Sequence, residues 1–511
     1  MPLPTRCRVL VLAISATLGI SGFAQESSLP PGPSAVTEGK VRLDEQETDS
    51  ALPANPAPGS YDELLKRLEK NEQEIARLNN ELSTNVDNDR SFRDVFEERW
   101  SKVQDPSITT VDEQTYTPGG SKPKQWYDRL SLRGYAQFRY NFVVDEDGAP
   151  AQLIGDRSVS DDQSFLIRRA RLIVSGDVSE NLYVYLQSDF ASTVPDSDDS
   201  TYYAQIRDWY GDLYFDEDKV HRVRIGQSKV PYGWEDLQSS SNRAPLDRSD
   251  SINSATRNER DLGVVYYWTP EGAQDLFKEV LDRGLKGSGN YGVFGIGAFN
   301  GQGGSTLEEN DNLHLYTRLA VPHKLENGQI LEMGVQAYTG KYVVGSAPIR
   351  PLGVPPAIIP AGTIGAGDDG GIVDQRLAGT FVWYPQPWGL QAEWNIGNGP
   401  GLNDEQTAVV KRSLTGGYVM ALYRLETESH GIIFPFGRYT YYQGGLKNFA
   451  NAPYGTINEW ELGFEWQINP QMEFSTQYTI ADRTNVSARS SGTSYGQFRG
   501  DIIRCQFQIN Y

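Results

Sequence analysis

The sequence contains few of the residues that build disulfides and metal centres. Among 511 residues there are two cysteines, four histidines and four methionines. Cys7 lies in a segment whose removal is predicted below, so only Cys505 would remain and no intramolecular disulfide could form. We therefore predict no metal site and no cofactor. The histidines lie in no recognisable nucleophile motif, so we predict that the chain is not an enzyme.

The sequence also lacks a run of about 18 apolar residues after its first segment, which argues against a membrane-spanning helix. Near the start, residues 9–20 are apolar, Arg6 and Arg8 precede them, and small residues follow at 22–24. This run is too short to cross a bilayer, so a transmembrane anchor is disfavoured. The layout predicts a signal peptide at 1–24 and an exported protein.

Positive charge is scarce. There are 67 Asp and Glu against 47 Lys and Arg, which gives a net charge of −20 and argues against a nucleic-acid partner. Aromatic residues and glycine are abundant instead, with 28 Tyr, 19 Phe, 10 Trp and 51 Gly. This composition is typical of a transmembrane β-barrel, in which half of each strand faces water inside the lumen.

Three segments are predicted to precede the barrel. Residues 25–60 are rich in proline, serine and acids and predict a disordered linker. Residues 61–85 predict a short coiled coil, with a polar Asn71 that would fix register or oligomeric state; a solvated amphipathic helix is the alternative. Residues 86–126 form a second linker. The heptad a and d positions are Tyr61, Leu64, Leu68, Asn71, Ile75, Leu78, Leu82 and Asn85.

From Leu130 onward apolar and polar residues alternate with a period of two, which predicts sixteen strands within residues 127–511. Short links follow the even strands, except that residues 270–289 contain a helix-like segment. Long links are predicted after the odd strands, at 143–163, 190–200, 230–259, 300–311, 340–373, 398–412, 443–456 and 483–498. The pattern predicts an all-β fold, a 16-stranded antiparallel transmembrane β-barrel. A soluble β-sandwich, the alternative, has no reason to sort its links by length.

The last strand ends in an aromatic residue. In the segment 504–511, Cys505, Phe507, Ile509 and Tyr511 share one face, which we expect to meet lipid, while the polar face meets the lumen. Tyr511 would lie in the aromatic girdle at the inner membrane boundary. A final aromatic strand also resembles the signal that outer-membrane assembly machinery reads.

Strand alternation predicts which charged side chains face the lumen. It directs one set of arginines inward, namely Arg133, Arg139, Arg169, Arg171, Arg222, Arg224 and Arg504. Arg168 falls on the lipid-facing parity, so we expect its side chain to snorkel or to lie near the membrane boundary. Later strands direct acids inward, namely Glu332, Glu393, Glu459, Glu461, Glu465 and Glu473. A single inward arginine can instead pair with Asp189, Asp208 or a loop acid and only brace the wall.

Three stretches resemble the phosphate-selective porin family, porins O and P. They are residues 165–190 with their Arg-Arg-Ala-Arg core, 223–249 with a Gly-Gln-x-Lys-x-Pro-Tyr turn, and 260–266. The resemblance implies a trimer of sixteen-stranded barrels, each with a constriction loop in its lumen, that passes anions along arginines and lysines. Arg168, Arg169 and Arg171 match the first motif, and Lys229 matches the turn. The loop arginines would be Arg243, Arg248 and Arg260.

We therefore expect an outer-membrane porin for small anions, with phosphate or polyphosphate as candidates. Its partners would be outer-membrane lipid, lipopolysaccharide and two further copies of the chain. The alternative is a general diffusion porin that also tethers the outer membrane to the cell wall through a periplasmic segment, residues 25–126. Which long loop forms the constriction stays open. The acidic loop 190–200 is interpreted as solvated, because it has no EF-hand pattern for Ca²⁺.

Overall fold

The structure is a computed structural model. It describes residues 126–148, 151, 153–156, 158–159, 164–191, 204–304, 306–350, 357–363, 370–489 and 492–511. The predicted signal peptide, both linkers and the coiled coil therefore lie outside the described residues, apart from Trp126 at the end of the second linker.

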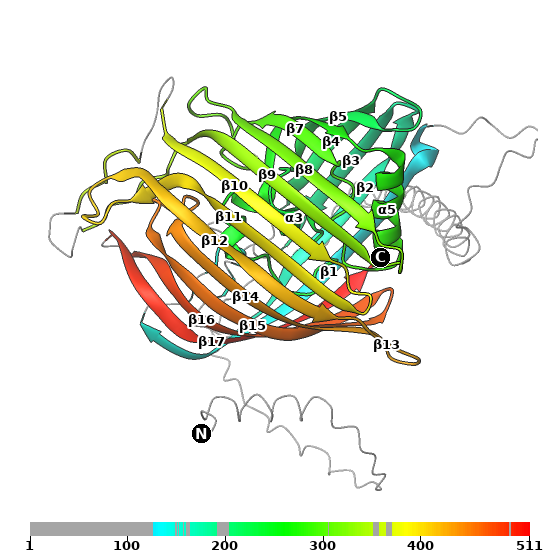
Figure 1. Cartoon of the computed structure of the whole chain (residues 1–511). Helices are drawn as coiled ribbons and strands as arrows, with labels where there is room; N and C mark the ends of the chain where they lie inside the picture. The colour runs from blue at the N-terminus through cyan, green and yellow to red at the C-terminus, as the bar shows by residue number, and fades with distance from the viewer. Residues whose placement is uncertain are drawn as a thin grey trace, which may run out of the picture. The chain divides into compact units, whose positions relative to one another are not determined.

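The described residues build one continuous antiparallel sheet (Figure 1). Its strands are β1 Leu130–Gly148, β2 Ser164–Ser179, β3 Leu182–Asp189, β4 Gln205–Tyr214, β5 His221–Lys229, β6 Arg260–Trp268, β7 Phe294–Phe299, β8 His314–Lys324, β9 Ile330–Tyr342, β10 Ile372–Trp383, β11 Trp388–Leu402, β12 Val409–Tyr423, β13 Leu425–Thr427, β14 Gly431–Gly445, β15 Tyr454–Asn469, β16 Met472–Arg489 and β17 Gly492–Asn510. The helices are η1 Trp126–Arg129, α3 Trp234–Leu237, α4 Asp250–Asn253, η2 Arg257–Glu259 and α5 Glu271–Asp282.

The sheet closes on itself. β17 pairs with both β16 and β1, so the last strand meets the first. β12 and β13 are two parts of one strand, since both pair with β14 and only Arg424 separates them. The predicted 16-stranded antiparallel barrel is therefore confirmed. Within the described residues, no helix is long and apolar enough to cross a membrane.

The C-terminal tyrosine lies at this seam. The main chains of Gly134 and Tyr511 exchange two hydrogen bonds, of 2.6 and 3.0 Å. A Cβ atom at position 134 would lie 2.5 Å from the Tyr511 ring, so the missing side chain leaves room for that ring. Glycine at 134 thus lets the terminal aromatic ring cover the join between the first and last strands.

The outer face of the sheet is apolar. Large side chains that alternation directs outward are exposed there, among them Leu132, Phe138, Trp394, Trp460 and Ile509. Polar residues of the opposite parity are buried inside the ring of strands. This is the inverse of a soluble protein, and it fits a barrel whose exterior meets lipid.

Three links predicted to be long are shorter than expected. In place of the links 398–412, 443–456 and 483–498, the gaps between strands are 403–408, 446–453 and 490–491. The prediction was wrong here because it ended each strand where apolar alternation stopped. Strand pairing continues further than this alternation. The helix expected in the exceptional link 270–289 is confirmed as α5.

The long link between β5 and β6, residues 230–259, folds into the barrel, and α3 lies inside the ring of strands (Figure 1). Trp234 of α3 is fully buried and packs in one cluster with Val280 and Leu285, at and beyond the end of α5, and with Val382 of β10. The interior is therefore a packed structure built on this link, which we call the constriction loop.

Candidate anion site at the constriction

The constriction loop is anchored on the wall that carries β9 and β11. The main-chain N–H groups of Trp234 and Glu235 donate to the Glu393 carboxylate, at 2.6 and 2.8 Å. The indole N–H of Trp234 donates to Glu332 at 3.1 Å. Two of the six predicted inward acids thus hold the loop rather than face open water.

A second set of anchors joins the loop to β1, β14, β16 and β17. Asp247 accepts from Arg139 at 2.6 Å and from Arg504 at 2.7 Å. Asp250 pairs with Arg483 at 2.6 Å, and Glu235 pairs with Arg438 at 2.5 Å. Of the predicted lumen arginines, Arg139 and Arg504 therefore brace the loop. The loop spans the lumen from wall to wall.

The Gly-Gln-x-Lys turn explains how the loop leaves β5. Lys229 Nζ donates to the main-chain carbonyls of Leu237 and Gln238, at 2.7 and 2.9 Å, where α3 ends. Arg248 donates to the carbonyls of Glu235 and Gln238, at 3.1 and 2.9 Å. Both cations satisfy carbonyl groups that a short helix leaves without partners. Lys229, predicted for the anion track, is buried as a clamp on the loop.

Arg168 does not follow the predicted parity. The pairing of β1 with β2 shifts after Gln137, which faces Arg169, whereas the next residue, Phe138, faces Ile167. Arg168 is therefore the extra residue of a β-bulge, and bulges redirect side chains. Its side chain is buried, 3.1 Å from Asp156. The expectation of a boundary position was wrong because strict alternation takes no account of bulges.

A second bulge, which sequence reasoning missed, lies on β4. Gln187 pairs with Asp208 and Ser188 pairs with Ile206, which leaves Arg207 as the extra residue. Arg207 and Asp208 are both buried inside the barrel. The available signal was two consecutive charged residues within an otherwise alternating strand, the same signal that Arg168 and Arg169 present.

Gln227 stabilises this second bulge. Its side-chain N–H group donates to the carbonyls of Ile206 and Arg207, at 2.9 and 3.0 Å. A bulge disrupts the local ladder of hydrogen bonds, so these carbonyls need another donor. Gly226 adopts φ +126°, and a Cβ there would lie 2.3 Å from the Trp209 carbonyl oxygen. The Gly-Gln pair therefore positions Arg207.

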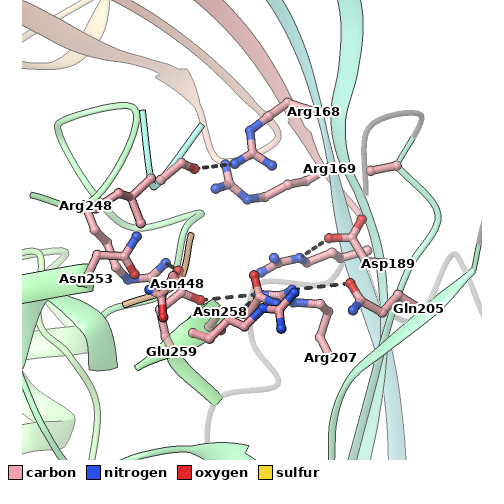
Figure 2. A pocket seen from close by; sticks show the side chains of 15 residues that line it. Arg168, Arg169, Asp189, Gln205, Arg207, Arg248, Asn253, Asn258, Glu259 and Asn448 are labelled. Atoms are coloured by element: carbon pink, nitrogen blue, oxygen red, sulfur yellow. Dashed lines mark hydrogen bonds and ion pairs between the residues drawn. The ribbon is translucent and has the colours of Figure 1, made fainter. Parts of the chain in front are cut away.

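Between the two bulges and the loop lies a cavity with about 590 Å³ of empty volume, which we call the arginine pocket. Figure 2 shows Arg168, Arg169 and Arg207 on one side of it and Arg248 and Glu259 on the other. Six arginines line the pocket, Arg168, Arg169, Arg171, Arg207, Arg248 and Arg257, against two carboxylates, Asp189 and Glu259.

The arginine pocket is strongly positive. Burial opposes ionisation of Glu259, but Arg248, Arg260 and Arg207 outweigh burial and hold the pKa of this carboxyl well below its usual range. Arg171 pairs with Asp189 at 2.9 Å. The Nε atoms of Arg169 and Arg207 are buried without a hydrogen-bond partner. Buried donors without a partner, on residues that line a cavity, are what an anionic ligand can satisfy.

The remaining predicted arginines lie elsewhere. Arg260 pairs with Asp208 and Glu259, at 3.0 and 2.8 Å. Arg222 and Arg224 pair with Asp212 on β4. Within the described residues, Arg243 and Arg133 have no carboxylate partner. Of the predicted arginines, Arg169, Arg171 and Arg248 line the arginine pocket. Arg139 and Arg504 share Asp247 with Arg169, and Arg260 shares Glu259 with Arg248.

Between the loop and β14, β15 and β17 lies a smaller cavity, with about 250 Å³ of empty volume. Three arginines line it, Arg248, Arg438 and Arg504, against five carboxylates, Asp156, Asp247, Asp250, Glu459 and Glu461. We call it the clasp, because its charges pair with one another: Arg438 with Glu461, and Arg504 with Asp247. Of the other inward acids, Glu465 pairs with Lys286, and Glu473 accepts from Asn510. Within the part of the chain that the structure describes, no three His, Cys, Asp or Glu side chains are grouped to hold a metal ion.

A family profile described as phosphate-selective porin O and P matches residues 147–511. The chain belongs to this family. The resemblance seen in the three sequence motifs is thereby confirmed, and the protein is an outer-membrane porin. A comparison with curated protein sequences found no match.

Solved structures similar to this porin are porins of low sequence identity. OmpT of Vibrio cholerae is 10% identical with a TM-score of 0.44, over 75% of this chain and 99% of that one. OprB of Pseudomonas putida is 8% identical with a TM-score of 0.45, over 75% and 94%. An anion-selective porin from Comamonas acidovorans is 10% identical with a TM-score of 0.40, over 75% and 99%. At these values the likenesses carry no information about substrate.

Proposed function

We propose that this porin gives passive passage to small anions, phosphate or polyphosphate among them, and that the arginine pocket is the step that selects them. The observation that carries the proposal is six arginines against two carboxylates around one cavity beside the constriction loop. Guanidinium groups keep their charge and donate paired hydrogen bonds to phosphate oxygens. A low-dielectric wall focuses their field into the lumen.

The pocket suits transit rather than tight storage. Its arginines are partly compensated, since Arg171 pairs with Asp189, and Arg207 lies 3.3 Å from Glu259. Partial compensation weakens each contact, and several weak sites in series let an ion enter and leave. Asp189 and Glu259 therefore tune the affinity of the pocket.

The test is the zero-current potential of the purified protein in a planar bilayer under a potassium chloride gradient, followed by phosphate titration. We expect an anion-selective potential and a chloride current that phosphate blocks. Arg169→Gln should weaken the block, whereas Arg412→Gln, which replaces an arginine outside the pocket that pairs with Asp404, should not. A cation-selective potential without phosphate block would refute the proposal.

The second candidate is a general diffusion porin. It is favoured by the clasp, where five carboxylates outnumber three arginines in a second cavity that shares Arg248 with the positive pocket. Two cavities of opposite charge produce a transverse field with little preference between ions. Equal permeability of chloride and potassium, with no phosphate block, would support this candidate.

Two further roles follow from the sequence. The first is a homotrimer, implied by the family, which sedimentation of the detergent-solubilised protein would test against a monomer. The second is a tether to the cell wall through residues 25–126, which lie outside the described residues apart from Trp126. Deleting 61–85 should release the protein from peptidoglycan on co-sedimentation, and unchanged binding would reject the tether.

A further inference from the structure

Next to the arginine pocket, the lumen wall carries arginines interleaved with tyrosines. The rings of Tyr185 on β3 and Tyr210 on β4 stack with centres 5.1 Å apart and planes 11° apart. The Arg224 guanidinium carbon lies 3.7 Å from the centre of the Tyr210 ring. The Arg133 guanidinium carbon lies 5.9 Å from the centre of the Tyr185 ring. The order along the wall is therefore Arg133, Tyr185, Tyr210, Arg224, which we call the Arg–Tyr face.

Arg133 differs from the other arginines of this wall. Its side chain is exposed, and its Nη1 donates only to the hydroxyls of Ser175 and Ser131, at 2.9 and 3.4 Å. Arg224, in contrast, holds Asp212 with two hydrogen bonds of 2.7 and 2.9 Å. Within the described residues no carboxylate neutralises Arg133. A charged guanidinium therefore stands open to water beside an aromatic ring.

The Arg–Tyr face begins directly beside the constriction loop. The Tyr135 hydroxyl lies 2.7 Å from Ser240 of the loop, and Arg133 is two residues further along β1 toward the periplasmic end, a rise of about 7 Å. Tyr185 and Tyr210 are mostly but not completely buried. Any solute that passes the loop on its arginine side meets this face next.

We propose that the Arg–Tyr face binds planar aromatic carboxylates. Arg133 supplies the donors for the carboxylate, and Tyr185, whose ring is stacked on Tyr210, supplies an aromatic contact beside it for the ring of the ligand. Neither feature alone discriminates, because the arginine binds any small anion and the tyrosine any flat ring. Together they favour an anion that carries an aromatic ring. This inference deepens the proposed function by naming a class of organic anion for the same channel.

The probes are benzoate and cyclohexanecarboxylate, which share charge and approximate size but differ in aromaticity. Each is titrated against chloride current through the full-length protein in a planar bilayer. We expect benzoate to block at about fivefold lower concentration. Tyr185→Leu should remove that preference, and Tyr185→Phe, which keeps the ring, should retain it. Arg133→Gln should weaken the block by both acids.

Tyr183→Leu is the matched control, because Tyr183 lies two residues away on the same face of β3 without a stacked ring partner among the described residues. Unchanged chloride conductance shows that each variant has folded. Equal block by the two acids in the wild type would overturn the inference, as would a benzoate preference that survives Tyr185→Leu. Phosphate block is measured separately, so its absence would refute the arginine pocket while leaving a benzoate preference intact.

Discussion

The arginine pocket and the clasp both border the constriction loop and share Arg248, yet their charges are used differently. In the clasp, Asp247 is held by both Arg139 and Arg504, and Arg438 is held by Glu235 and Glu461. In the arginine pocket, arginines outnumber carboxylates and some of their N–H groups have no partner. The same residue type therefore braces the loop in the clasp, whereas in the pocket Arg169 and Arg207 each keep one buried N–H group without a partner.

This difference explains how a chain with a net charge of −20 can present a positive lumen. Net charge describes the whole chain, whereas an ion in the lumen responds to uncompensated charges within about one Debye length, near 10 Å. The clasp takes up wall arginines in ion pairs with an excess of carboxylates. The arginine pocket holds more arginines than carboxylates, because two bulges add Arg168 and Arg207 to its lining.

Reversing a charge in the arginine pocket should have the largest effect on anion selectivity. Arg169→Glu should raise the phosphate concentration needed for half-block more than tenfold and shift the zero-current potential toward cations. The new carboxylate removes one donor and neutralises its neighbours Arg168 and Arg171. Arg169→Lys keeps the charge but not the paired donors. Its half-blocking phosphate concentration should lie between those of the wild type and Arg169→Glu. A wild-type block in Arg169→Glu would contradict the assignment of the pocket.

A smaller effect is expected from Gln227→Leu. The substitution removes the side-chain N–H group that donates to the carbonyls of Ile206 and Arg207. The bulge should therefore relax, and Arg207 should leave the pocket. We expect phosphate block to weaken about threefold to tenfold, as for the loss of one charged hydrogen bond. Chloride conductance should change little. Gln391→Leu, at a buried glutamine on β11, is the matched control, and an equal effect there would reject a specific role for Gln227.

On the clasp side, Arg504→Gln should affect stability more than selectivity. Asp247 would lose one of its two closest cations, and breaking a buried pair costs about 3 kcal/mol or more. We expect a lower unfolding temperature and noisier single-channel current, because the loop is held less firmly. Phosphate block should change less than twofold. A large loss of block with normal stability would show that the clasp also contacts the anion.

The smallest effect is expected from Asp236→Asn. Burial raises the pKa of this loop carboxyl well above its usual range, although Arg248 opposes the shift. A carboxyl with a raised folded-state pKa stabilises the fold while protonated, and that contribution is lost as pH rises above the unfolded value of about 4. Relative to wild type, the variant should gain stability as pH increases, with unchanged ion selectivity. Parallel pH profiles for the two proteins would contradict this.

The wall of this porin could be read from its sequence because lipid imposes a regular pattern. Trp460, Leu462 and Ile509 alternate with polar residues, and each strand must follow that rule wherever its outer face meets hydrocarbon. This alternation was enough to predict the number of strands and the inward direction of arginines such as Arg169 and Arg171. Beyond the lipid the rule lapses, which is why the strand extensions at 483–489 and 492–498 were missed.

The site could be predicted only in part, since its decisive features are not periodic. Nothing in alternation distinguishes Arg139, which pairs with Asp247, from Arg133, which has no carboxylate partner among the described residues. That distinction depends on where the constriction loop crosses the lumen. The role of Lys229 likewise depends on the position of α3, which a motif does not reveal.

Composition and a period of two therefore determine, from the sequence alone, that this chain forms a porin barrel with a charged interior. Tertiary structure decides which of those charges remain available. The reason is physical: the membrane acts on every strand in the same way, whereas ion pairing depends on distances between residues far apart in the chain. Asp247 and Arg504 are 257 positions apart, and their side chains lie 2.7 Å from each other.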